Sequence, residues 1–375
     1  MKRLIILLLL VLIALTGCTT KKEKVEQQGL GKPSEPINDP IDEPIEEIVD
    51  ENNNSLRIFK ADPSSFHFVA DWLTDSEILY VEMRNGVYQV KSFNLKTGES
   101  NLVYEDESFI TDIIVHPSLD YLLVHTSDQS DLAVVKVVSM DGVVQHQVEI
   151  TSTELAIEWN DLDPEKILFT AFHEDWSFDL FVFNGHTEGL SVIEMDDPFP
   201  KWIDDNRIAN MLFSEHPLDG GEVQILNSAT GETETLTAGN VIYFDTYENK
   251  LLIVQSLESD NFTYSLRDGD GTMLANWIMP PVSNYSEWVV PEVEWINGES
   301  FLYKAASKSG QLDELSSQFN LYLQEVGNSK IIIEGLDADS LACSPTGKRC
   351  LNGYTFEEVI DVESGERLNW IEFDK

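Results

Sequence analysis

A short segment recurs along the chain at a nearly constant spacing, and this period limits the possible folds more than any other feature. Each copy places a tryptophan, or a residue in its place, between two apolar stretches and just before a polar turn. The seven positions are Trp72, His116, Trp159, Trp202, Tyr247, Trp295 and Ser344, which lie 43 to 49 residues apart. Repeated units of about 40–45 residues made of short apolar runs are typical of β-propeller blades.

A second recurring feature, a glycine turn, completes each unit. The first unit contains NLKTGES around Gly98, and NSATGET and DVESGER repeat the pattern around Gly231 and Gly365. Glycine supplies the positive φ of a tight hairpin, so this turn joins the third and fourth strands of a unit. The sequence therefore predicts an all-β propeller of four-stranded blades over residues 57–375. We count seven blades, with six as the alternative because the fifth and sixth units are the least regular.

The start of the chain predicts export and attachment to the membrane. Lys2 and Arg3 precede an unbroken apolar run of 12 residues, from Leu4 to Leu15. This run is shorter than the roughly 20 residues of a membrane-spanning helix and suits a signal peptide over residues 1–17. The sequence Leu-Thr-Gly-Cys that ends at Cys18 resembles the bacterial lipobox. That resemblance implies lipid attachment to Cys18 and cleavage just before it.

The segment that follows, residues 18–56, combines regularly placed prolines with many carboxylates. Pro33, Pro36, Pro40 and Pro44 recur among Asp and Glu residues, and large apolar residues are sparse. Proline stiffens such a segment and like charges extend it, which predicts a tether between the membrane and the propeller. An acidic interaction tail is the alternative.

The organisation as a whole resembles a known family. The sequence SPTGK at residues 344–348 is similar to the turn of TolB and WD40-like propeller repeats. Together with the lipobox and the acidic tether, the propeller resembles the YqgU-like lipoproteins of Gram-positive bacteria. This resemblance implies a β-propeller that is lipid-anchored on the extracellular face of the cell membrane, and it implies no particular activity.

The charge balance and the missing motifs narrow the function. The 67 acidic residues outnumber the 24 basic ones and give a net charge of -43, which repels nucleic acid and excludes it as a partner. The chain contains no G-x-S-x-G and no H-E-x-x-H sequence. We therefore predict no catalytic residues, cofactor or metal, and expect a binding or scaffold module for an unknown protein or cell-envelope ligand. The alternative is a lactonase-like enzyme, which three or four convergent polar side chains in the central channel would favour.

The two remaining cysteines predict a local cross-link. Cys343 and Cys350 flank the SPTGK turn, and pairing outward from the turn centre places them opposite each other on antiparallel strands. An extracytoplasmic location permits a disulfide there. Two free, packed thiols are the alternative.

The lengths of the loops predict a binding face. In a propeller, the loops between the second and third strands lie on the same face as the connections between blades. In this chain these loops are longer and more varied than those on the opposite face, and recognition usually uses such loops. The residues predicted to form this face are His173, Asp175, Trp176, Asp219, Tyr285 and Asp313. Insertions without a function are the alternative.

Overall fold

A computed structural model describes residues 56–258 and 261–373. The predicted signal peptide, the lipidation of Cys18 and the tether up to residue 55 lie outside these ranges. The described residues form strands, turns and two short 3-10 helices. In this part of the chain no helix is long and apolar enough to cross a membrane.

Most of the predicted units form antiparallel sheets of four strands whose order follows the sequence. The first two sheets are β2 (Phe66–Thr74), β3 (Glu77–Arg84), β4 (Val87–Asn94), β5 (Ser100–Asp106), and β6 (Ile110–Val115), β7 (Tyr121–Gln129), β8 (Leu132–Ser139), β9 (Val144–Thr151). The third is β10 (Glu154–Trp159), β11 (Lys166–Phe172), β12 (Phe178–Asn184), β13 (Gly189–Ile193). The last two are β23 (Glu292–Asn297), β24 (Ser300–Ala306), β26 (Phe319–Glu325), β27 (Asn328–Leu336), and β28 (Leu341–Cys343), β29 (Arg349–Asn352), β30 (Glu358–Asp361), β31 (Arg367–Asn369).

The fourth and fifth units share a single sheet of seven strands. Its strands are β14 (Lys201–Trp202), β15 (Arg207–Phe213), β16 (Gly221–Asn227), β17 (Thr233–Tyr247), β18 (Lys250–Glu258), β19 (Asn261–Asp268) and β20 (Met273–Met279). The first half of β17 pairs with β16 and its second half pairs with β18, so one strand closes the fourth unit and opens the fifth. The described residues thus contain seven units in six sheets of four or more strands, because the fourth and fifth units share one sheet. The predicted count of seven blades is not confirmed as seven separate sheets.

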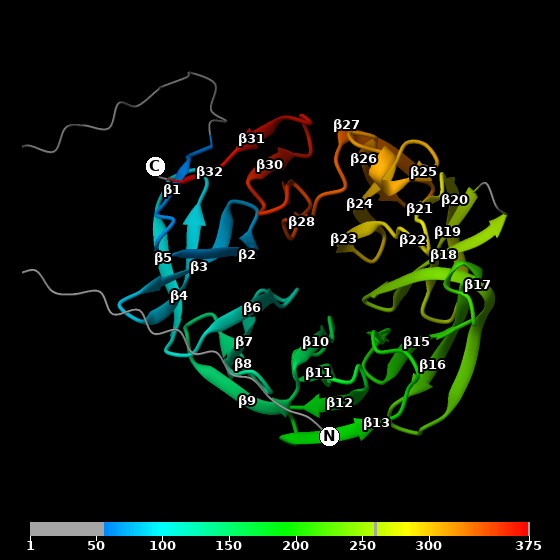
Figure 1. Cartoon of the computed structure of the whole chain (residues 1–375), viewed down its shortest axis with the longest axis horizontal. Helices are drawn as coiled ribbons and strands as arrows, with labels where there is room; N and C mark the ends of the chain where they lie inside the picture. Colours follow the sequence, from blue (N-terminus) through cyan, green and yellow to red (C-terminus); the bar gives the residue numbers. More distant parts are fainter. Residues whose placement is uncertain (1–55, 259–260, 374–375) are drawn as a thin grey trace, which may run out of the picture. The chain divides into compact units, whose positions relative to one another are not determined.

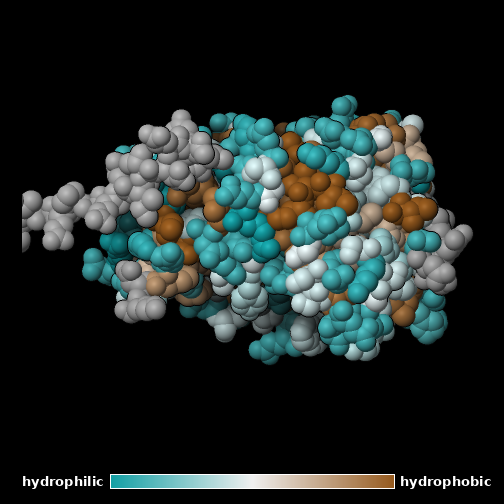
Figure 2. Space-filling view, turned by 90° about the horizontal axis from the view of Figure 1, so that it is seen from above, coloured by the Kyte–Doolittle hydropathy of each residue, from teal (hydrophilic) through white to brown (hydrophobic). Residues whose placement is uncertain are grey.

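The sheets follow one another around a central axis, with the first strand of each unit innermost (Figure 1). Neighbouring inner strands contact each other, including β2 with β6, β10 with β14, and β17 with β23. The ring closes where β2 contacts β28, and a short parallel pair of β1 (Phe59–Ala61) and β32 (Ile371–Phe373) joins the first and last strands of the described chain. Apolar clusters between adjacent sheets form the core, and the side shown in Figure 2 carries hydrophilic residues with hydrophobic patches among them.

The recurring residues act as predicted within the units. Gly98 and Gly231 adopt φ values of 77° and 75° in the hairpins between third and fourth strands. Trp72 and Trp159 are buried and donate their indole N–H groups to backbone oxygens, in one case across the ring closure to Ala342 at 2.9 Å. The period of the sequence therefore reflects a repeated packing position.

A small accessory sheet interrupts the repeat between the fifth and sixth units. It consists of β21 (Val282–Asn284), β22 (Glu287–Trp288) and β25 (Gly310–Gln311), and the short helix η2 (Leu312–Glu314) follows it. The indole N–H of Trp288 donates to the backbone oxygen of Leu218 at 2.9 Å, in the other short helix, η1 (Pro217–Asp219). This contact fastens the accessory sheet to the fourth unit.

Candidate functional site

The first group of predicted binding residues lies in the loop between β11 and β12. The His173 ring nitrogen Nε2 lies 2.9 Å from Asp179 Oδ2, and the Asp175 carboxylate accepts hydrogen bonds from the backbone and hydroxyl of Ser177. These bonds hold Trp176 at the tip of the turn with a φ of 66° and a relative exposure of 85%. An aromatic residue held in an ordered loop and exposed to solvent is well placed to anchor a ligand.

The second group lies around the accessory sheet. The Tyr285 hydroxyl donates to Asp313 Oδ2 at 2.7 Å, and Tyr285 is 69% exposed with a φ of 57°. Asp219 ends η1, the helix that Trp288 fastens to the accessory sheet. No contact that the structure gives for its described residues joins this group to the loop of Trp176. The six predicted residues therefore lie in two groups, and their role in a binding face stays a prediction.

Beside the first group, the packing between the third and fourth units is incomplete. In three other units, the recurring tryptophan of the first strand pairs with a residue of the second strand, and the residue two positions further along that strand is a buried aromatic. These aromatics are Tyr80, Phe169 and Tyr303. The equivalent residue of the fourth unit is Asn210, because Trp202 pairs with Ile208. The inner strand β14 is also only two residues long. Only three buried residues form the apolar cluster in this described part of the ring, so a cleft lies where a blade interface would be filled.

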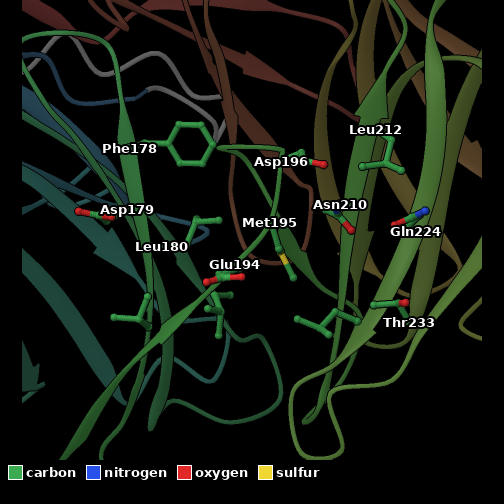
Figure 3. A pocket seen from close by; sticks show the side chains of 13 residues that line it. Phe178, Asp179, Leu180, Glu194, Met195, Asp196, Asn210, Leu212, Gln224 and Thr233 are labelled. Carbon is green, nitrogen blue, oxygen red and sulfur yellow. The ribbon is translucent and has the colours of Figure 1, made fainter.

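The cleft has a volume of about 390 Å³, within the ~300–1,000 Å³ range of ligand pockets. Aliphatic side chains line part of it, including Leu180, Leu212 and Leu226. Asn210 and Gln224 are partners on adjacent strands, and both line the cleft (Figure 3). Asn210 is only 5% exposed, yet its side-chain amide makes no hydrogen bond to any residue in the described ranges. The Asn210 amide is not among the buried side-chain atoms without a partner, so it opens on the cleft and can pair with a ligand or with water there.

A fixed connection and the first group form the rim of the cleft. Buried Asp197 accepts backbone N–H groups from Met211 at 2.7 Å and Phe199 at 2.8 Å, which fastens the segment between β13 and β14 to β15. Asp179 lines the cleft and also contacts His173, so the loop of Trp176 borders the cleft directly. Sequence reasoning located this loop but missed the cleft. Aligning the second strands of the units would have shown Asn210 in an aromatic position.

The axial region contains a second, smaller cavity of about 200 Å³, lined by Asp71, Glu294, Tyr247 and His116 among others. Burial raises the pKa of Asp71 to about 6, against hydrogen bonds from backbone N–H groups. Burial likewise raises the pKa of Glu294 to about 8, although the Cys343 N–H donates to this carboxylate at 3.0 Å. These two acids therefore retain protons at higher pH than ordinary carboxyl groups.

Other polar groups near the axis are already paired with protein atoms. Both ring nitrogens of His116 are engaged, one with Ser118 Oγ and one with the Asn160 oxygen, each at 2.9 Å. Lys201 lies 3.0 Å from Glu158 and 3.3 Å from Asp245. Burial lowers the pKa of Lys201, but these two carboxylates outweigh it and hold that pKa well above its ordinary value.

The cavity lining brings together the side chains of Asp71, His116 and Glu294, which is the lower limit of the three or four convergent groups set for the enzyme alternative. Each of the three is already hydrogen-bonded to protein atoms. Among the residues that the structure describes, no group of three or more His, Cys, Asp or Glu residues is arranged to hold a metal ion. The axial cavity therefore offers a polar, acidic surface.

Cys343 and Cys350 are partners on β28 and β29, the register predicted by pairing outward from the turn. The structure joins their sulfur atoms in a disulfide, with the two Cα atoms 3.9 Å apart. The bridge lies beside Glu294, which accepts the Cys343 N–H. It therefore fastens the last unit next to the axial cavity.

Comparisons with known proteins agree on the fold. The model of a family described as a YqgU-like 6-bladed beta propeller domain matches residues 94–353. The lipoprotein YqgU of Bacillus subtilis (strain 168) is 23% identical over 297 residues, covering 79% of this chain and 81% of that protein. The crystal structure of protein lmo1340 from Listeria monocytogenes EGD-e has a TM-score of 0.79 and 19% identity, and covers 86% of this chain and 99% of that one.

A more distant likeness concerns ring closure. The β-propeller domain of the Trilobed protease from Pyrococcus furiosus, which has an open velcro topology, gives a TM-score of 0.53 and 15% identity over 83% of this chain and 99% of that one. In the described part of this chain, too, the first and last four-stranded sheets exchange no strand. The likeness supports the fold alone.

Proposed function

Because the chain belongs to the YqgU-like six-bladed β-propeller family, we propose that it is a lipid-anchored binding module on the outer face of the cell membrane. Its ligand enters the cleft between the third and fourth units and contacts the loop of Trp176. Asn210 carries this proposal, because it places a polar amide at the wall of the cleft in a position that three other units fill with an aromatic ring.

The anchoring rests on the lipobox and on the relative. The sequence Leu-Thr-Gly-Cys ends a short apolar run at Cys18, and the Bacillus subtilis relative is a lipoprotein by name. Replacing Cys18 with Ser should move the protein from the membrane fraction to the soluble fraction. Full retention of the Cys18→Ser variant in the membrane would refute the anchor.

The binding role rests on the contents of the cleft and of the axial cavity. The cleft combines aliphatic walls with hydrogen-bonding groups that have no partner in the described protein, a mixture typical of ligand sites. In the axial cavity, the carboxyl groups of Asp71 and Glu294 already accept backbone N–H groups, and the described residues contain no group of three or more possible metal ligands. Binding without chemistry is therefore the function that this geometry supports best.

The test fills the cleft as the neighbouring unit does. Asn210→Phe places in the fourth unit the residue that the third unit has at Phe169. Ligand-observed NMR with a panel of soluble dipeptides, amino acids and sugars would compare the full chain with this variant. We expect compounds that bind the natural protein and not Asn210→Phe, while the variant keeps or raises its melting temperature. Compounds that bind both proteins equally would refute the cleft as the site.

A further inference from the structure

The charges around the cleft identify the class of ligand. Glu194 and Asp196 line the cleft two residues apart on the connection after β13, and both are exposed to solvent. Neither makes an ion pair with another described residue, whereas the third carboxylate of the lining, Asp179, is paired with His173. Among the described residues, no Lys, Arg or His lines the cleft. Two unpaired carboxylates in a lining without cations repel anions and favour a cationic group.

The walls of the cleft indicate a second property of the ligand. The amides of Asn210 and Gln224 each offer an acceptor and an N–H₂ donor from neighbouring positions of one sheet. A peptide backbone presents the complementary groups, since each residue carries one N–H and one C=O. The aliphatic residues Leu180, Leu212 and Leu226 provide contact area for small apolar side chains. Figure 3 shows Asn210 between Asp196 and Gln224, so the amides and the acidic rim can be contacted together.

We infer that the cleft binds a short peptide segment with a basic side chain, whose backbone pairs with Asn210 and Gln224 and whose cation lies between Glu194 and Asp196. This inference rests on the proposed function, because it specifies the ligand of the same cleft. Asn210 provides evidence independent of the acidic residues, since it is nine-tenths buried and has no partner in the described protein.

Isothermal titration of the full lipidated chain in detergent micelles tests the inference with four probes. They are the blocked tripeptides Ac-Ala-Lys-Ala-NH₂, Ac-Ala-Gln-Ala-NH₂ and Ac-Ala-Glu-Ala-NH₂, and the polyamine spermidine. We expect the lysine peptide to bind about fivefold or more tightly than the glutamine peptide, and the glutamate peptide most weakly. The double change Glu194→Gln and Asp196→Asn should remove the preference for lysine, whereas Asp205→Asn, in the exposed turn between β14 and β15, should preserve it.

The outcomes separate this inference from the proposed function. Equal binding of the lysine and glutamine peptides, with both lost in Asn210→Phe, would overturn the charge preference and leave the cleft as the binding site. Spermidine binding as tightly as the lysine peptide would overturn the role of the peptide backbone. Failure of all three peptides to bind would overturn the inference as a whole. Binding of the lysine peptide that survives in Asn210→Phe would overturn the site itself.

Discussion

Replacing Glu294 with glutamine should reduce the loss of stability at alkaline pH. Burial raises the pKa of Glu294 from 4.5 to about 8, so the folded protein holds a proton that the unfolded chain releases at lower pH. The folded state therefore binds more protons across this window, and stability falls as pH rises from about 4.5 to about 8. The amide introduced by Glu294→Gln would be neutral throughout and could still accept the Cys343 N–H.

The magnitude follows from the size of the shift. Taken in full, a shift from 4.5 to about 8 corresponds to about 5 kcal/mol. Glu294 is only half-buried and borders a cavity, so solvent screening reduces this value, and we expect about 1–2 kcal/mol. Glu294→Gln should thus gain about 1–2 kcal/mol over the natural protein between pH 5 and pH 8.5.

Urea unfolding of the purified full chain at four pH values between 5 and 8.5 measures this difference. Glu299→Gln, in the exposed hairpin between β23 and β24, removes a carboxylate from the same unit and serves as the control. It should follow the natural protein at every pH. If Glu294→Gln shows the same dependence on pH as the natural protein, the protonated carboxyl group in the axial cavity is refuted.

Three further predictions concern closure of the ring. Trp370 is fully buried against Phe59 and Phe93, so Trp370→Ala should cost about 3–5 kcal/mol in denaturant unfolding, and a loss below 1 kcal/mol would contradict closure through β1 and β32. Burial raises the pKa of Asp75, but hydrogen bonds from Thr346 and Lys348 outweigh burial and lower that pKa to about 2. Asp75→Asn should therefore reduce the free energy of unfolding by about 1 kcal/mol at pH 7, and this loss should disappear as pH falls from 3.8 to 2. A cost that persists at pH 2 would exclude the charge as its cause. Alkylation without reduction, followed by mass spectrometry, should leave Cys343 and Cys350 unlabelled, whereas two labelled cysteines would exclude the disulfide.

The repeat could be predicted from the sequence because its recurring residues occupy the same packing and turn positions in each unit. Each conserved tryptophan position lies at or near the end of an inner strand, and each glycine turn needs a backbone conformation that few other residues adopt. The register of Cys343 and Cys350 followed from counting alone. The number of separate sheets did not follow, because β17 continues from one unit into the next through backbone pairing that side chains do not specify.

The sites were harder to predict than the fold. Trp176 and Tyr285 could be placed in exposed loops, but the distance between those loops depends on the assembled ring. The carboxylates of the axial cavity could not be distinguished among 67 acidic residues, because their pKa shifts come from burial by distant strands. The cleft depends on a missing aromatic side chain at Asn210, which is visible only when the units are compared position by position.

Photocrosslinking in intact membranes tests the central claim most directly. The full chain would carry p-benzoylphenylalanine in place of Trp176, in the loop that borders the cleft through Asp179, or in place of Asp205 in the turn between β14 and β15. A binding module that uses the cleft predicts a discrete adduct from position 176 that disappears when Asn210→Phe is added, and no such adduct from position 205. The same adduct from both positions, or one that persists with Asn210→Phe, would contradict the account.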